Sequence, residues 1–104
     1  MTSIESGEYT GSEEEGNQQG TAARTATAVL RYLGVELTQH PDRVVVQEVA
    51  DGDKRVKLTL LVDKADMGRV IGRQGKIAGA IRAVVRAAGA KDGIDASVEI
   101  QERD

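Results

Sequence analysis

The chain has 104 residues, of which 39% are hydrophobic and 30% charged, and it contains no Cys, Phe or Trp. This length suits one soluble domain, while the missing cysteines exclude disulfides, thiolate metal sites and cysteine nucleophiles. The net charge of −3 is unfavourable for nucleic-acid binding when the whole chain is averaged. It does not exclude such binding, because acidic and basic residues are distributed unevenly along the chain.

Residues 1–20 contain five of the 17 acids and no base, and they are rich in Gly, Ser, Glu and Gln. Such a segment buries too little apolar surface to offset the entropy of ordering. We predict a disordered acidic tail over 1–20 and one folded domain over 21–104. No apolar run reaches the ~20 residues of a membrane span, and no apolar signal-peptide region follows the initiator Met. The sequence therefore predicts a cytoplasmic protein without membrane contact.

Apolar residues at helical spacing predict a first helix over 21–33, which Gly34 should end. A connection containing Pro41 follows. β-Branched and alternating apolar residues then predict strands over 44–49 and 56–62. The Asp-Gly-Asp sequence at 51–53 marks the turn between them, so the two strands should form a hairpin.

In the second half, Asp63 is placed to cap a short helix over 64–70. The glycines of 72–75 interrupt it, and an amphipathic helix should follow over 76–88, with Gly89 and Gly93 ending it. Alternation over 96–101 predicts a third strand. The order α-β-β-α-α-β predicts an α+β domain with a three-stranded sheet and helices packed on one face.

The stretch from Lys64 to Lys91 has seven bases and one acid, Asp66. Inside it, Gly72 and Gly75 permit a tight turn between two helices and let a ligand backbone approach closely. Gly75 also opens a helix, where free amide groups and the helix dipole favour an anion. With the charges of Arg73 and Lys76, the turn is a candidate site for a polyanion backbone.

Other glycine-loop motifs fail on spacing. A P-loop needs Gly at the position of Val70 and Ser or Thr at the position of Ile77. A dinucleotide fingerprint needs glycines at its first, third and sixth positions after a strand, which Gly68, Gly72 and Gly75 do not supply.

The order strand, helix, GxxG, helix, strand resembles the KH domain, whose GxxG loop clamps about four nucleotides. Two elements ahead of this core indicate type II. The segments His40-Pro41-Asp42, 66–76 and 81–88 resemble the small bacterial KH proteins of the KhpA family, over roughly residues 22–100. The tail over 1–20 is extra to that pattern.

This resemblance implies binding of single-stranded RNA by residues in and beside the loop: Arg69, Ile71, Gly72, Arg73, Gln74, Gly75, Lys76 and Arg82. Arg82 and Arg86 lie one helical turn apart and either extend the basic patch or face solvent. The aliphatic residues Leu60, Val70, Ile71, Ile77 and Ile81 are candidates for a base groove, although their spacing fits plain core equally well. With Tyr32 alone on the first helix, the aromatic stacking platform of other RNA-binding modules is excluded.

No catalytic set is visible. The single histidine, His40, precedes Pro41 in a turn, and no metal-ligand cluster, cofactor motif or site for a small-molecule substrate is predicted. The family is associated with self-association, with a larger KH-containing RNA-binding partner, and with post-transcriptional control and cell elongation or division. A homodimer or heterodimer is therefore expected. The alternative function is a protein–protein assembly module in which RNA contact is secondary.

Overall fold

The central strand of the sheet is the segment with the longest apolar alternation in the sequence. A computed structural model describes residues 23–104 and places this strand, β2, at Arg55–Asp63. It pairs antiparallel with β1 (Val45–Ala50) and parallel with β3 (Asp95–Arg103), which gives the sheet order β1-β2-β3. The predicted hairpin and third strand are therefore confirmed.

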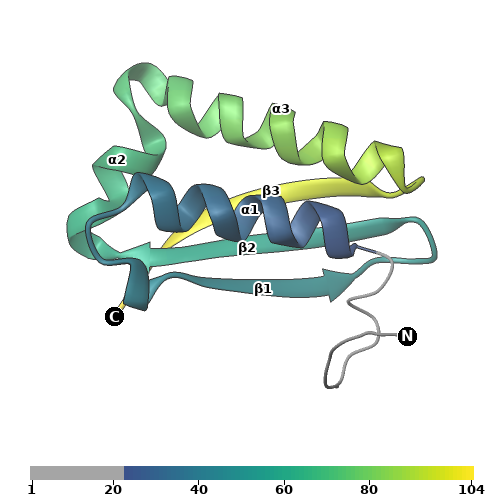
Figure 1. The fold of residues 1–104 in the computed structure, drawn as a ribbon, viewed down its shortest axis with the longest axis horizontal. Coiled ribbons are helices and arrows are strands. Elements are labelled where there is room, and N and C mark those ends of the chain that lie inside the picture. The colour runs from purple at the N-terminus through teal and green to yellow at the C-terminus, as the bar shows by residue number, and fades with distance from the viewer. Residues whose placement is uncertain (1–22) are drawn as a thin grey trace, which may run out of the picture.

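Three helices cover one face of this sheet (Figure 1). They are α1 (Arg24–Leu37), α2 (Met67–Ile71) and α3 (Lys76–Lys91). Short 3₁₀ turns at Pro41–Arg43, Lys64–Asp66 and Arg73–Gly75 join the larger elements. The predicted α+β class and the order α-β-β-α-α-β are confirmed, with the helices on a single face of the sheet.

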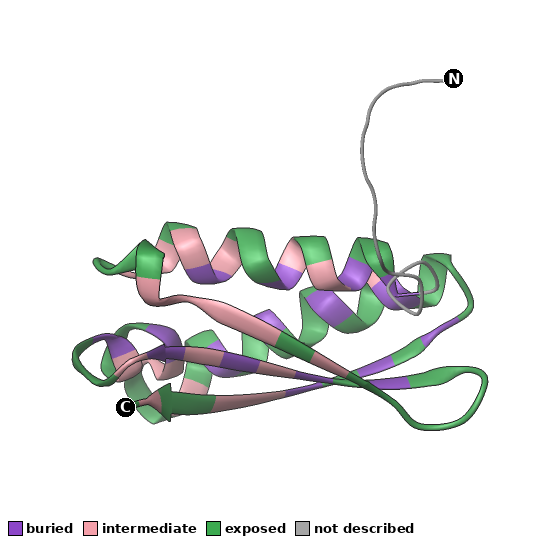
Figure 2. Cartoon of the chain, turned by 90° about the horizontal axis from the view of Figure 1, so that it is seen from below, coloured by how far each residue is buried: buried purple, intermediate pink, exposed green. Residues whose placement is uncertain are grey.

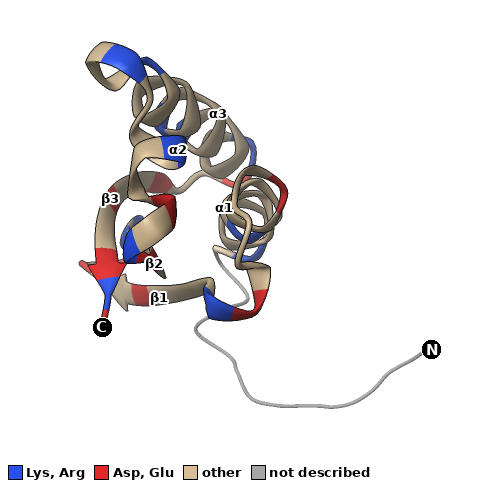
Figure 3. Ribbon diagram, turned by 90° about the vertical axis from the view of Figure 1, so that its left-hand side faces the viewer, with Lys and Arg blue, Asp and Glu red and all other residues tan. Residues whose placement is uncertain are grey.

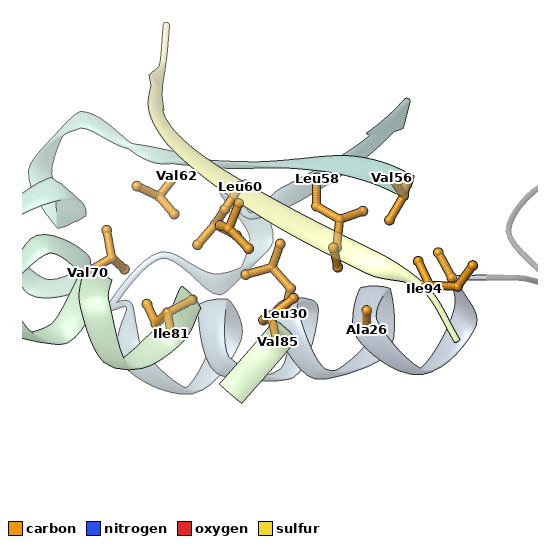
Figure 4. Close-up of a cluster of buried hydrophobic side chains, with 13 residues drawn as sticks. Ala26, Leu30, Val56, Leu58, Leu60, Val62, Val70, Ile81, Val85 and Ile94 are labelled. Carbon is orange, nitrogen blue, oxygen red and sulfur yellow. The ribbon is translucent and has the colours of Figure 1, made fainter. Parts of the chain in front are cut away.

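The core between the two layers is aliphatic (Figure 4). Its fully buried side chains come from every layer, with Leu30 on α1, Leu58 and Leu60 on β2, Val70 on α2 and Val85 on α3. Each of these contributes about 1.5–3 kcal/mol by leaving water. Figure 2 shows the buried positions facing inward between the helices and the sheet.

The opposite face of the sheet is mostly polar and open to solvent. Cross-strand ion pairs join Lys57 to Glu99 at 3.2 Å and Arg55 to Asp95 at 3.8 Å, between side chains that are about half exposed or more. The hydrogen bond from Lys57 lowers the pKa of the Glu99 carboxyl. Exposed pairs of this kind add at most about 1 kcal/mol each, so the stability of the domain comes from the helix-covered face.

Two glycines that were predicted to end helices lie inside them. Helix α1 continues through Gly34 to Leu37, and a Cβ at Gly34 would come within 2.8 Å of Leu60 Cδ1 and 3.0 Å of Val44 Cγ1. Helix α3 continues through Gly89 to Lys91, where a Cβ would lie 2.9 Å from the Ile94 carbonyl oxygen. These predictions were wrong because both glycines allow close packing and neither ends its helix.

Smaller differences concern the other boundaries. The segment predicted as one short helix begins as a 3₁₀ turn and becomes α-helical only at Met67, and each strand differs by one or two residues from its predicted ends. The predicted tail over 1–20 and the first residues of the predicted helix lie outside the described residues. Within 23–104, no helix combines the length and the apolar character that crossing a membrane would require.

Candidate nucleic-acid interface

The turn between α2 and α3 has a backbone that few residues other than glycine can adopt. Gly72 has φ 76° and ψ 173°, Gln74 has φ 58° and ψ 24°, and Gly75 has φ 74° and ψ 14°. The Gly75 N–H donates to the Gly72 carbonyl oxygen at 3.1 Å, which closes the turn. The predicted reversal at the two glycines is therefore present, with Gln74 as an additional left-handed residue.

This turn presents its charges to solvent. Arg73, Gln74 and Lys76 are exposed, and neither base has an ion-pair partner among residues 23–104. The Lys76 N–H, the first of the 16-residue α3, donates to the Arg73 carbonyl oxygen, and the next amide groups of α3 lack partners within the helix, as at any helix N-terminus. Figure 3, which views the end of the molecule where α2 lies, shows basic residues on the turn and along α3. Donors, dipole and charge thus converge on one exposed turn.

The basic residue ahead of the turn, Arg69, is tied to an acid. Its Nε lies 3.7 Å from Oδ1 of Asp66, and its side chain is 50% exposed while that of Asp66 is 1% exposed. The same carboxylate accepts hydrogen bonds from the backbone N–H groups of Gln39 and His40, each at 3.1 Å. The connection between α1 and β1 is therefore fastened to the start of α2.

The imidazole of His40 completes this cluster. Its Nδ1 lies 3.0 Å from Oδ2 of Asp66, and this hydrogen bond raises the pKa of His40 above its ordinary value of 6.5. Burial alone would raise the pKa of the Asp66 carboxyl, but the hydrogen bonds from Gln39 and His40 lower it overall. Asp66 therefore remains a carboxylate at neutral pH despite its burial.

Arg82 lies further along α3 and contacts the sheet. Its Nε donates to the Val98 carbonyl oxygen at 3.2 Å, across the gap between α3 and the edge strand β3. Gly79, Arg82 and Arg86 share one face of α3 by their spacing, and a Cβ built at Gly79 would meet nothing within 4 Å. The basic surface thus extends from the turn along α3 toward β3.

The aliphatic candidates for a base groove divide into two groups. Leu60, Val70 and Ile81 are buried in the core, at 0%, 0% and 2% exposure. Ile71 at the end of α2 is half-buried, and Ile77 in the first turn of α3 is exposed. Only Ile71 and Ile77 therefore offer apolar surface beside the turn.

The sequence did not indicate two of the contacts described above. No local pattern predicts the partners of Asp66, although it is the one acid in a stretch with seven bases. The Val98 carbonyl oxygen was not predicted as a neighbour of Arg82, because a strand-to-helix contact across 16 residues has no local signal. Among residues 23–104, no group of three His, Cys, Asp or Glu side chains is placed to hold a metal ion.

The glycine turn between two helices, with its open helix N-terminus and the order α-β-β-α-α-β, defines a KH domain of type II. The family model described as "KhpA/KhpB, KH domain" matches residues 27–100. The chain belongs to this family.

Several bacterial relatives are named "RNA-binding protein KhpA". The protein of Aquifex aeolicus is 45% identical over 74 residues, which cover 71% of this chain and 92% of the relative. That of Clostridium acetobutylicum is 44% identical over 72 residues, covering 69% and 95%. That of Listeria monocytogenes is 46% identical over 66 residues, covering 64% and 86%.

Proposed function

We propose that this protein binds single-stranded RNA through the turn between α2 and α3. The observation that carries the proposal is the turn itself, in which two glycines with positive φ precede a 16-residue helix and the exposed basic residues Arg73 and Lys76 lie on either side of Gln74-Gly75. The relatives named above carry RNA binding in their names, and the family model that matches residues 27–100 spans this turn.

The proposed binding mode follows from the chemistry of the turn. At Gly75, where a Cβ would meet nothing within 4 Å, no side chain keeps a sugar–phosphate backbone away, and the free amide groups in the first turn of α3 can donate to phosphate oxygens. Arg73 and Lys76 add charge on either side, while Arg69 offers a planar fork suited to phosphate. Gln74 and Ile71 contribute polar and apolar contacts beside the turn.

Arg82 extends the proposed site to the sheet. The Arg82 side chain lies between α3 and the edge strand β3. An RNA strand that left the turn along α3 would therefore pass over Gly79 and reach the Arg82 guanidinium. With no aromatic side chain on this path, bases would be held by aliphatic packing and hydrogen bonds. One such module makes few contacts, so we expect weak binding.

Salt dependence gives a first measure of this site. With three or four phosphates neutralised, log K against log salt should have a slope of about −2 to −3, at roughly −0.7 per contact for single strands. A slope close to zero would indicate that phosphate contacts are not the basis of binding.

The decisive variant replaces Arg73 and Gln74 with Asp. Two carboxylates at the turn would repel phosphate and compete for the same amide donors, so RNA binding should be abolished. The fold should persist, because both side chains are exposed, Asp tolerates the left-handed backbone of Gln74 better than most residues, and acids suit a helix N-terminus. The measurement is a titration of labelled single-stranded RNA, with circular dichroism as the check of folding.

A matched control places the same two charges at another helix N-terminus. Arg24→Asp with Thr25→Asp changes one Arg and one neutral residue in the first turn of α1, at the opposite end of the molecule from the glycine turn (Figure 1). This control should bind RNA within about twofold of the unmodified protein at 0.15 M salt. If the Arg73/Gln74 variant is folded and also binds within about twofold, the turn is not the RNA site.

In the cell, we propose that the protein acts in the cytoplasm in post-transcriptional regulation, with a role in cell elongation or division. Its partner there would be a larger KH-containing RNA-binding protein or a second copy of the chain. This part of the proposal is supported by the family membership and by the weak affinity expected of a single module, since two linked sites raise avidity without new contacts.

A second function, as an assembly module, is favoured by one observation. An apolar groove of about 300 Å³ lies between α1 and α3, on the face of α3 away from Arg82. Its apolar lining comes from Leu33 and Leu37 of α1 and from Ile77, Ala80, Ile81 and Val84 of α3, and Lys76 also lines it. Val84 is 49% exposed. An apolar surface of this kind suits the dimer contact, and it lies on another face of α3 than Gly79, Arg82 and Arg86, while sharing Lys76 with the proposed RNA site.

A further inference from the structure

The buried acid Asp66 stands beside a site proposed for a polyanion. It is the one acid among the seven bases from Lys64 to Lys91, and its side chain is 1% exposed. A buried carboxylate has a large desolvation cost, and its negative charge lowers the attraction for phosphate. Both effects are unfavourable, and a favourable contact of Asp66 is needed to offset them.

The contacts of Asp66 indicate what that role is. Three of its contacts, with the N–H groups of Gln39 and His40 and with the imidazole Nδ1, lie between 3.0 and 3.1 Å and fix both carboxylate oxygens in place. The remaining contact is with Arg69, at 3.7 Å from Oδ1 and through Nε. The carboxylate is thus held in place by the α1–β1 connection, and it contacts the guanidinium of Arg69 on α2.

The contact lies on the Nε side of the Arg69 guanidinium, at an ion-pair distance of 3.7 Å. This tether draws the guanidinium toward Asp66 and leaves the N–H groups of both Nη atoms for a ligand. Arg69 lies three residues ahead of Gly72, on a helix of five residues that ends at Ile71. Orienting it in the free protein removes part of the side-chain entropy that binding would otherwise cost.

We infer that Asp66 is a positioning residue for RNA, which acts by holding the Arg69 guanidinium beside the glycine turn. The inference rests on the proposed RNA binding and adds to it a residue that does not itself touch RNA. The inference and simple electrostatics predict opposite changes in RNA affinity when the charge of Asp66 is removed. Removing a negative charge near a phosphate site should tighten binding, whereas removing the tether should weaken it.

The test is a double-mutant cycle on RNA affinity with Asp66→Asn, Arg69→Gln and the combined variant. We expect Asp66→Asn alone to weaken binding about threefold, within the range of an exposed ion pair. In the Arg69→Gln background the same change should leave affinity within about 1.5-fold or tighten it, since the residue that Asp66 positions is gone. Arg31→Gln, which removes an exposed charge on α1, is the control for loss of one positive charge.

Two outcomes would overturn the inference. Tighter binding by Asp66→Asn alone would mean that only its charge matters. An equal loss of affinity in both backgrounds would mean that Asp66 supports the fold without acting through Arg69.

A second measurement uses the unmodified protein and so does not depend on the folding of any variant. In a nitrogen–proton correlation spectrum, the Nε–H of Arg69, assigned by its loss in Arg69→Gln, should exchange with water more slowly than that of Arg31. Equal exchange rates would show that Arg69 is not tethered, which overturns the inference without reference to RNA. Failure of the proposed function is recognised separately, because it would appear as RNA binding that survives Asp at positions 73 and 74.

Discussion

Gly72 and Gly75 have nearly the same φ, 76° and 74°, but their ψ angles of 173° and 14° put them in different regions of backbone space. The conformation of Gly72 is essentially restricted to glycine. That of Gly75 is the left-handed helical region, which other residues enter at moderate cost. Their surroundings differ as well, since a Cβ at Gly72 would lie 2.6 Å from Ile77 Cγ1 and 2.9 Å from Ile77 N, whereas one at Gly75 would meet nothing within 4 Å.

The two glycines should therefore respond differently to alanine. We expect Gly75→Ala to lower the free energy of unfolding by about 1 kcal/mol, and Gly72→Ala to lower it by about 3 kcal/mol or more, because backbone strain and the clash with Ile77 combine. Urea unfolding followed by circular dichroism measures both. Equal losses for the two variants would contradict this account of the turn.

At the scale of elements, the His40–Asp66 contact joins the α1–β1 connection to α2. The groups that face the imidazole are all acidic: Asp66 by hydrogen bond, with Asp63 and Asp42 acting at longer range. Asp63 has a lowered pKa, chiefly because its carboxylate accepts from the Ala65 N–H, with a further contribution from Arg43. It therefore remains charged beside the histidine at neutral pH.

The raised pKa of His40 makes stability depend on pH in a definite direction. Its contribution is fully present below the unfolded value near 6.5 and is lost as the pH rises through the higher folded value. The free energy of unfolding should therefore fall between about pH 6 and pH 8.5, and His40→Gln should flatten this dependence. Urea unfolding of both proteins at the two pH values is the measurement. Because the chain has a single histidine, an unchanged pH dependence in the variant would exclude this contact as its source.

The elements themselves were largely predictable, because each depends on local patterns. The alternation of Val56, Leu58, Leu60 and Val62 and the spacing of the two loop glycines are visible without any tertiary contact. What could not be predicted depends on residues far apart in the sequence. Whether Gly34 ends a helix or packs inside one is decided by Leu60 and Val44. The partners of Asp66, Gln39 and His40, lie 27 and 26 residues earlier in the chain.

At the scale of the whole molecule, α3 serves two different surfaces. Gly79, Arg82 and Arg86 lie on the face toward β3, and Ile77, Ala80 and Val84 lie on the face toward α1. A partner bound in the apolar groove would therefore leave Gly79, Arg82 and Arg86 uncovered but would contact Lys76. The proposed assembly contact and the proposed RNA path thus meet only at Lys76.

We predict that Val84→Glu weakens self-association by about tenfold or more, because burying an unpaired carboxylate in an apolar contact is costly. Sedimentation velocity at micromolar concentrations is the measurement. Val49→Glu is the matched control, since Val49 is 59% exposed on β1, outside the groove, and lies opposite Lys57, which can pair with the new acid. A Val84→Glu protein that sediments as the same dimer would place the contact elsewhere. A strictly monomeric unmodified protein would leave the larger KH-containing partner as the sole option.

The mixed sheet has a consequence for how the domain folds. The β1–β2 hairpin closes over a short turn, but β2 and β3 pair in parallel between residues whose numbers differ by 40, as in Arg55 with Asp95. We expect that ladder to form after the connection through α2, the glycine turn and α3 has brought the two strands together. Such non-local pairing places mixed α/β domains between the microsecond and second extremes of folding times. The turn proposed to hold RNA is thus also the bend in the connection that brings β3 to β2. Substitutions there should change the folding rate as well as affinity, whereas substitutions in the hairpin turn should leave affinity unchanged.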